Sequence, residues 1–128
     1  MEEEFFFEKL TVYQESRALV NKATYALVRK FPEYERYALC DQLRRAIVSV
    51  PSNIAEGVSR VSVKEKLHFL DISFGSLMES YCQLQLALDE NYITEEEYKN
   101  IKHSFFTVGK LLNSFKASIA KKGNETNN

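Results

Sequence analysis

The longest uninterrupted pattern in the chain is a helical repeat of apolar residues between residues 63 and 88. Apolar side chains recur there at steps of three or four residues, which places them along one side of an α-helix. They are Val63, Leu67, Leu70, Phe74, Leu77, Met78, Tyr81, Leu84 and Leu88. A long helix with one continuous apolar side buries that side against other helices. The pattern predicts a helical bundle.

The rest of the chain has the same helical character. Its 128 residues include four Gly, two Pro and no Trp, and no alternating strand pattern occurs. A chain of this length suits one domain and buries roughly two thirds of its unfolded surface. We predict an all-α protein with a single up-down four-helix bundle over residues 1–128, in which residues 7–120 form the ordered core and residues 121–128 a frayed polar tail.

Capping signals divide the chain into four helices. Three pairs have the spacing of a capping box, in which a hydroxyl and a Glu or Gln side chain satisfy each other's backbone N–H groups. They are Thr11 with Gln14, Ser62 with Glu65, and Thr94 with Glu97. The first helix should end before Pro32, because a residue before proline avoids the α region. The second should begin near residues 33–35, the third end near Asp89 and the fourth near Ala120.

A proline lies inside the predicted second helix. The apolar positions on either side of it fall within one helical arc. They are Leu39, Leu43, Ala46, Ile47, Val50, Ile54 and Gly57. Because the arc continues past Pro51, we expect the helix to be kinked there and to continue, with Ser52 or Asn53 serving the freed carbonyl. Asn53 lies at the edge of the arc, where an unpaired buried amide costs about 1–3 kcal/mol, so its amide should be hydrogen-bonded.

Polar residues share the opposite side of the second helix. They are Arg45, Ser49, Ser52 and Glu56, with Arg44 beside them. One interpretation is a solvated face with weak ion pairs. The other is that Arg44, Arg45 and Glu56 pair with groups on other helices or other subunits, since the planar guanidinium suits bidentate contacts.

The predicted third helix carries a second row that faces water in a monomer. It contains His68, Ile72, Gly75, Glu79 and Leu86. A mid-helix Gly lowers helix propensity by about 1 kcal/mol relative to Ala, which indicates that another element approaches Gly75 closely. We therefore predict a homo-oligomer with a mixed apolar and polar interface. The predicted interface and polar network comprises Arg44, Arg45, Asn53, Glu56, Ile72, Gly75, Glu79 and Leu86.

The predicted fourth helix is rich in lysine. Between Tyr98 and Lys122 there are six lysines and no acidic residue. Four of them lie within about a 100° arc, namely Lys99, Lys102, Lys110 and Lys121. This row is either a solvated face or, repeated around an oligomer, a contact surface for RNA or DNA phosphates. The net charge of −1 gives no general attraction to polyanions, and the acidic N-terminal residues 2–8 would quench the row.

No complete set of catalytic or metal-binding residues occurs. A di-iron bundle needs two Glu-x-x-His units. Only one such unit is present, at Glu65 and His68, and His103 belongs to none, while Cys40 and Cys82 form no Cys-x-x-Cys pair. Both cysteines are expected to be buried thiols of a reduced cytoplasm. We predict a cytoplasmic protein with no enzymatic activity, no catalytic residue, no cofactor, no metal and no small-molecule substrate. No apolar run approaches the length that crosses a membrane.

Three segments together resemble a known family. They are FP..E at Phe31, Pro32 and Glu35, QLRRAIVSVPSNIAEG from Gln42 to Gly57, and SFGSLMES from Ser73 to Ser80. The chain is similar, from about Phe7 to Ile119, to the four-helix-bundle proteins encoded in intervening sequences of bacterial 23S ribosomal RNA, also called S23 ribosomal protein-like. Ala38 stands where that family commonly has Gly, a change that stiffens the helix.

The resemblance implies a cytoplasmic bacterial bundle that forms ring-like homo-oligomers, often pentamers. It also implies kinship with strongly basic accessory proteins of diversity-generating retroelements, which bind nucleic acid and a reverse transcriptase. This chain departs from those basic relatives, because its isoelectric point is about 6.1. We predict a self-assembling interaction or scaffold protein whose activity is not established. The alternative is an RNA- or DNA-binding accessory protein that uses the lysine row.

Overall fold

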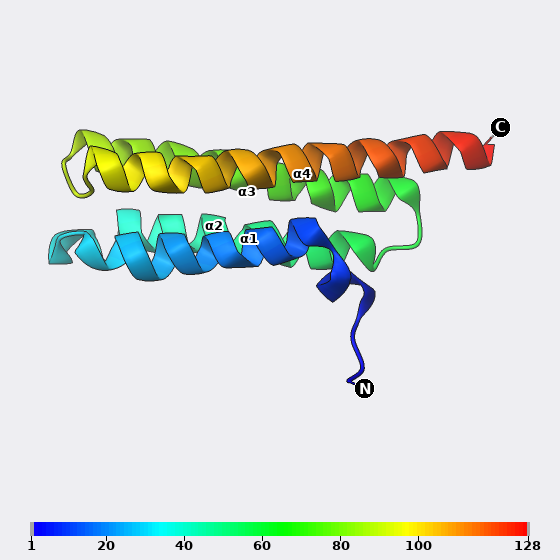
Figure 1. Cartoon of the computed structure of the whole chain (residues 1–128), viewed down its shortest axis with the longest axis horizontal. Coiled ribbons are helices and arrows are strands. Elements are labelled where there is room, and N and C mark those ends of the chain that lie inside the picture. Colours follow the sequence, from blue (N-terminus) through cyan, green and yellow to red (C-terminus); the bar gives the residue numbers. More distant parts are fainter. Residues whose placement is uncertain (1, 128) are drawn as a thin grey trace.

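Four long helices lie side by side in two layers. The computed structural model describes residues 2–127, apart from the side chains of residues 25, 26, 126 and 127. The helices are α1 (Thr11–Asn21), α2 (Leu39–Val58), α3 (Val63–Asp89) and α4 (Glu95–Asn127). α1 and α2 form one layer and α3 and α4 the other, with α1 packed on α2 and α4, and α3 on the same two helices (Figure 1). Over residues 2–127 the fold is all-α, without strands.

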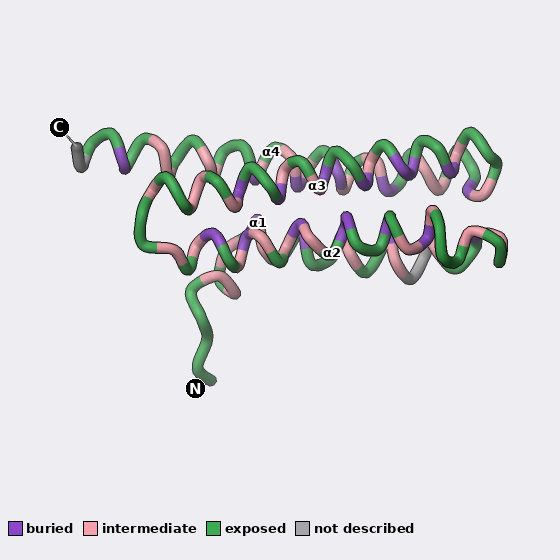
Figure 2. Tube along the Cα trace, turned by 180° about the vertical axis from the view of Figure 1, so that it is seen from behind, coloured by how far each residue is buried: buried purple, intermediate pink, exposed green. Residues whose placement is uncertain are grey.

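The core lies between the two layers (Figure 2). Its largest fully buried apolar side chains are Leu19, Leu43, Ile47, Ile54, Leu70, Leu77, Leu84 and Leu112. Burying a side chain of this size contributes about 1.5–3 kcal/mol, so these residues supply much of the drive to fold. Among the helices of the described chain, none combines the length and apolarity needed to cross a membrane.

The first predicted capping box is wrong. Leu10 occupies the cap position and Thr11 is already the first residue of α1. The Gln14 side-chain amide instead donates to the Glu8 carbonyl oxygen at 2.9 Å. A 3-10 turn, η1 (Phe6–Lys9), leads directly into α1 and brings that carbonyl within reach of Gln14. The Gln14 side chain therefore ties the first turn of α1 to η1, and α1 has no side-chain cap at its N-terminal end.

The helical path of α1 continues to the predicted proline boundary with changed geometry. It passes through a π-helix, η2 (Lys22–Leu27), and a 3-10 turn, η3 (Val28–Lys30). Phe31 then adopts an extended conformation with ψ 147°, directly before Pro32, as expected for a residue that precedes proline. A further 3-10 turn, η4 (Glu33–Glu35), follows. α2 begins only at Leu39, after the predicted start at residues 33–35.

α2 continues through Pro51, as predicted. The missing N–H of a proline frees the carbonyl four residues earlier, here that of Ile47. Ser52 Oγ donates to the Val48 carbonyl oxygen at 2.9 Å, and Asn53 Nδ2 donates to that of Ser49 at 2.8 Å. Both side chains thus bond to the carbonyls that follow Ile47, so the expectation that Ser52 or Asn53 serves the freed carbonyl itself is wrong.

The buried side of α3 differs from the predicted one. Leu70, Leu77 and Leu84 are fully buried as expected, and Ser73 and Ser80 are fully buried between them. The other predicted core positions are half-buried or exposed, and Met78 is 45 % exposed. Small serines let α3 lie close to α2, and this packing turns the side of α3 that bears Phe74, Met78 and Tyr81 toward the molecular surface.

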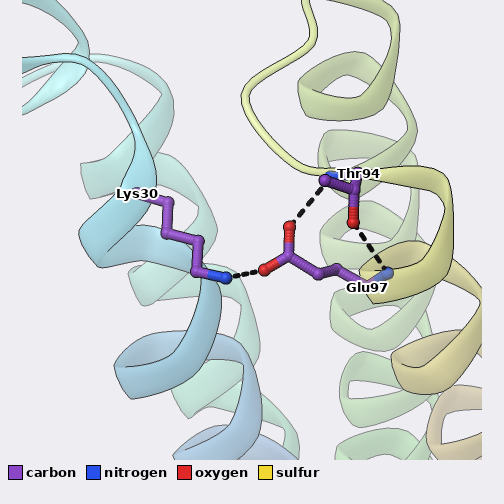
Figure 3. Close-up of polar contacts among 3 residues, drawn as sticks. All are labelled: Lys30, Thr94 and Glu97. Atoms are coloured by element: carbon purple, nitrogen blue, oxygen red, sulfur yellow. Dashed lines mark hydrogen bonds and ion pairs between the residues drawn. The ribbon is translucent and has the colours of Figure 1, made fainter.

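The predicted start of α4 is accurate, and its predicted end is not. The Thr94 hydroxyl accepts from the Glu97 N–H at 3.1 Å, while the Glu97 carboxylate accepts from the Thr94 N–H at 2.9 Å and also pairs with Lys30 (Figure 3). The backbone N–H groups of Thr94 and Glu97 are thereby hydrogen-bonded at the start of α4. The ion pair with Lys30 holds this start against the helical segment that follows α1. At its other end α4 runs to Asn127, so the predicted end at Ala120 is wrong. Residue 128 of the predicted tail lies outside the described residues.

The α3–α4 connection is built on one left-handed residue. Asn91 has φ 62°, a conformation that Asn tolerates better than most residues. The Tyr92 N–H donates to the Ala87 carbonyl oxygen and the Asn91 N–H to that of Leu88. These two bonds form a Schellman motif, which ends α3 and turns the chain into α4. The predicted end of this helix near Asp89 is confirmed.

Candidate interaction surfaces

Hydroxyl and amide groups join α2 to α3 along one seam. The Ser49 and Ser76 hydroxyl oxygens are 2.8 Å apart, with one donating to the other. Asn53 Nδ2 donates to both the Oγ and the carbonyl oxygen of Ser49, each at 2.8 Å. The Asn53 amide is therefore hydrogen-bonded, as its position at the edge of the apolar arc required.

The α3 row next to this seam is exposed in the single chain. Ile72 is 39 % exposed and Leu86 is 50 % exposed, although both are large apolar side chains. His68, Gly75, Glu79 and Cys82 complete the row at helical spacing, and all four are exposed. We define the α2–α3 face as Arg45, Ser49, Asn53 and Glu56 on α2 with Ile72, Gly75, Glu79 and Leu86 on α3.

The two helical glycines of α2 and α3 have different surroundings. A Cβ added at Gly57 would lie 3.1 Å from Phe69 Cβ and 3.2 Å from the Lys66 carbonyl oxygen, so the close packing of α2 on α3 requires this glycine. A Cβ added at Gly75 would meet no atom within 4 Å. Nothing in the fold of one chain explains why Gly75 lacks a side chain.

The predicted arginine pairs form within α2 or next to it. Arg45 Nε lies 3.0 Å from Asp41 Oδ2, one turn earlier, and the Arg45 side chain is 81 % exposed. Glu56 pairs with Arg60, one turn later. Pairing of these groups with other helices of the same chain is therefore not observed. Arg44 precedes Val48 by one turn, and Val48 lines a hollow shared with α1, so Arg44 lies on the α1 side of α2 and away from the α2–α3 face.

Two basic residues between α2 and α3 were not singled out by the sequence patterns. The Arg60 guanidinium lies 4.7 Å from the centre of the Phe69 ring, in a cation–π contact. Lys66 Nζ donates to the Val58 carbonyl oxygen at 3.2 Å and to that of Arg60, which places a positive charge at the C-terminal end of α2. Both side chains hold the short α2–α3 connection. The sequence signal that could have identified Arg60 and Lys66 is their position shortly after the C-terminal end of α2.

The four predicted lysines do not share one environment. Lys99, Lys110 and Lys121 are exposed on α4, whereas Lys102 is half-buried. Lys102 Nζ lies 5.9 Å from the centres of both the Tyr98 and Phe106 rings. Elsewhere on α4, Lys116 Nζ lies 2.5 Å from Asp71 Oδ1 of α3, so an acidic residue outside α4 neutralises one lysine.

An apolar groove lies between α3 and α4 on the surface. Its volume is about 290 Å³. It is lined by Phe74, Met78 and Tyr81 from α3 and by Phe105, Phe106, Gly109, Lys110 and Asn113 from α4. Met78 is 45 % and Phe106 54 % exposed, so the groove presents apolar surface to solvent. The sequence pattern did not predict this groove, because it assigned Met78 to the core. We call it the α3–α4 groove.

One end of the groove contains a tyrosine pair. The hydroxyl oxygens of Tyr81 and Tyr98 are 2.7 Å apart, and Gln85 Nε2 donates to the Tyr98 hydroxyl at 3.2 Å. Burial, together with the Tyr98 hydroxyl, raises the pKa of Tyr81 to about 12. The neutral phenol is thus the favoured form of Tyr81 in the folded chain.

The described residues show no metal-ligand cluster. No group of three His, Cys, Asp or Glu side chains within residues 2–127 is placed to hold a metal ion. Cys40 is buried, and burial raises the pKa of its thiol, whereas Cys82 is exposed in the outer row of α3. The expectation that both cysteines are buried is therefore wrong for Cys82, because the outer row of α3 lies off the core side.

The described chain is a four-helix protein whose notable surfaces are the α2–α3 face and the α3–α4 groove. The family model of the 23S rRNA-intervening sequence proteins matches residues 8–114. The chain belongs to this family, which confirms the resemblance carried by its three sequence segments. No curated protein matches the sequence.

A solved structure shares the fold. It is a protein with unknown function from the S23 ribosomal protein family of Bacteroides thetaiotaomicron, with a TM-score of 0.75 and 24 % sequence identity. The similarity covers 83 % of this chain and 98 % of that one. Identity at this level shows a common helical architecture.

Proposed function

We propose that this chain is a non-enzymatic scaffold or interaction protein that assembles with copies of itself through the α2–α3 face. The observation that carries the proposal is the outer row of α3. Ile72 and Leu86 expose apolar surface there, and a Cβ added at Gly75 between them would meet no other part of the described chain within 4 Å. A helix backbone without a side chain at its centre allows a neighbouring helix to approach closely.

The composition of the α2–α3 face suits an interface that forms from folded chains. Its apolar groups are interspersed with hydroxyl, amide and carboxylate groups, as in interfaces between stable protomers. Arg45 holds only an exposed pair with Asp41, a kind of contact worth about 0–1 kcal/mol. Its guanidinium is therefore available to a carboxylate of a neighbouring copy, such as that of Glu79 or Glu56.

Further features belong to the same proposal. We propose that successive helices alternate in direction, so that the bundle is up-down, and that α2 bends at Pro51, where one backbone N–H is missing. We also place the protein in the cytoplasm. The short connections between α2 and α3 and between α3 and α4 support the alternating arrangement.

A paired surface variant tests the proposal. Ile72→Glu with Leu86→Glu introduces two charges into the proposed interface, and Val61→Glu serves as the matched control because Val61 is 95 % exposed in the α2–α3 connection. We expect sedimentation velocity to show smaller species for the double variant and unchanged species for the control. Equal assembly of both variants would refute this choice of face.

A second candidate function is polyanion binding by α4. Lys99, Lys110 and Lys121 are exposed along this helix, which supports the proposal that they contact RNA or DNA phosphates in an assembled protein. Counterion release then makes the affinity fall steeply with salt. Replacing these three lysines and Lys102 by Glu should abolish binding of structured RNA in a low-salt gel-shift assay. Absence of binding by the unaltered protein at low salt would exclude this function.

A further inference from the structure

The N-terminal segment combines charge with exposed apolar surface, although the Phe5 ring stacks on that of Phe7. Residues 2–4 are three exposed glutamates. Phe5 is 76 % and Phe6 65 % exposed, which makes them among the most exposed large apolar side chains described. Two adjacent phenylalanines in water are unfavourable, because each leaves most of its aromatic surface unburied.

The base of this segment is held in place. The Phe7 ring packs edge-on against Tyr13, with 4.8 Å between ring centres, and the Phe5 N–H donates to Glu8 Oε2 at 2.8 Å. These contacts fix where the segment leaves α1. In Figure 1 the N-terminal end projects away from the layer of α3 and α4, with the α1–α2 layer between them. The segment therefore points away from the α3–α4 groove of its own chain.

The α3–α4 groove has the complementary chemistry. Its apolar lining includes Phe74, Met78 and Phe106, and its α4 side carries Lys110 and, beside Phe106, Lys102. Gly109 lies in the same wall, where a Cβ would be 3.6 Å from Leu77 Cδ2, so the absence of a side chain deepens the groove. With a volume of about 290 Å³ it suits one or two side chains of a peptide segment better than a larger ligand.

The lengths also agree. From Lys102 to Lys110 the axial rise of α4 is about 12 Å. Residues 2–5, which precede η1, span about 14 Å when fully extended. The glutamates and the phenylalanines of the segment can thus reach the lysines and the apolar lining at the same time.

We propose that residues 2–6 of one copy dock into the α3–α4 groove of a neighbouring copy. Phe5 and Phe6 insert beside Met78 and Phe106, and the glutamates lie against Lys102 and Lys110. This contact joins two different surfaces and is therefore head-to-tail. It rests on the proposed self-assembly and adds a second contact to the α2–α3 face. It also assigns an intermolecular role to the lysines that the sequence pattern associated with nucleic acid.

Site-specific cross-linking of the full-length chain tests the docking directly. A photoreactive phenylalanine analogue replaces Phe5, and copies labelled with ¹⁵N are mixed with unlabelled copies so that mass spectrometry separates links between copies from links within one. We expect links between copies to Met78, Phe106 or their neighbours in the groove. Links within one copy, or to another surface, would overturn the proposal.

A charge swap supplies the matched control. Lys102→Glu with Lys110→Glu should lower the yield of these links about tenfold, and adding Glu→Lys changes at residues 2–4 should restore it. Lys121→Glu should leave the yield unchanged, because Lys121 lies outside the groove. Sedimentation of the same samples separates the two proposals. Oligomers without groove links would overturn the docking alone, whereas monomers without links would overturn both.

Discussion

The Ser73 hydroxyl donates a 2.8 Å hydrogen bond to the Val50 carbonyl oxygen, joining the buried side of α3 to α2 directly before Pro51. Both residues are fully buried, so water competes for neither group. The small side chain allows the helices to approach each other, and Ser73 lies on the same buried side of α3 as Leu70 and Leu77. This orientation of α3 places Met78 at the α3–α4 groove and leaves Ile72 on the opposite, outer row.

Removal of this hydroxyl should weaken the fold by a measurable amount. Ser73→Ala loses one buried hydrogen bond, and we expect the free energy of unfolding to fall by about 1 kcal/mol. Urea denaturation followed by circular dichroism measures the change. Ser114→Ala is the control, because Ser114 is exposed on α4 and should leave the midpoint nearly unchanged. Equal midpoints for both variants would contradict the assigned role of Ser73.

The two glycines should respond oppositely to alanine. Gly57→Ala forces a Cβ against Phe69 and Lys66, and overpacking of this kind costs about 1–3 kcal/mol. Gly75→Ala meets open space in the single chain and should add up to about 1 kcal/mol of helix propensity. Denaturation at a concentration low enough to separate the copies measures both. Destabilisation of such monomers by Gly75→Ala would contradict the surroundings described for this residue.

A larger side chain at Gly75 should act on assembly. Gly75→Leu fills the space that the proposal reserves for a neighbouring helix, so it should reduce the mass in light scattering while circular dichroism stays unchanged. Leucine is a good helix former, which keeps the fold itself from being the cause. Undiminished mass would place the interface away from Gly75.

The N-terminal cap of α4 should contribute independently of assembly. Thr94→Ala removes the hydroxyl that accepts from the Glu97 N–H and should lower the free energy of unfolding by about 1 kcal/mol. Thr94→Ser keeps the hydroxyl and serves as the control. Thermal or urea unfolding compares them. A serine variant as unstable as the alanine variant would show that the methyl group, rather than the hydroxyl, matters.

Alkaline pH should destabilise the fold through Tyr81. Its pKa is raised to about 12 in the folded chain, so the unfolded state, with a tyrosine pKa of about 10, loses the proton first. Stability from this group is therefore present below pH of about 10 and is lost as the pH rises toward 12. Tyr81→Phe should make the urea midpoint depend less on pH across this interval. An unchanged dependence on pH would assign the alkaline loss of stability to other groups.

Local signals predicted much of the fold. The capping boxes at Thr94 and Ser62 are contacts between residues three apart, and both hydroxyls accept the expected N–H. The end of α3 and the boundary at Pro32 depend equally on nearby residues. These predictions succeeded because the atoms that decide them lie within one turn of each other.

The rotation of α3 could not be predicted in the same way. The apolar pattern assigns Met78 to the core, but α3 packs on α2 through the side that carries Ser73, whose hydroxyl bonds to Val50, and this leaves Met78 45 % exposed. The partners of this bond are far apart in the sequence, so no local periodicity contains it. The pairing of Arg45 with Asp41 was likewise open, because exposed arginines have several carboxylates within reach.

The central claim is that copies of this chain cover one another's α2–α3 face, and sedimentation equilibrium of the unaltered protein tests it most directly. The mass of one chain is 14.8 kDa. We predict a species whose mass is a multiple of this value at micromolar concentrations, with dissociation on dilution. A single species of 14.8 kDa at all concentrations would contradict the claim.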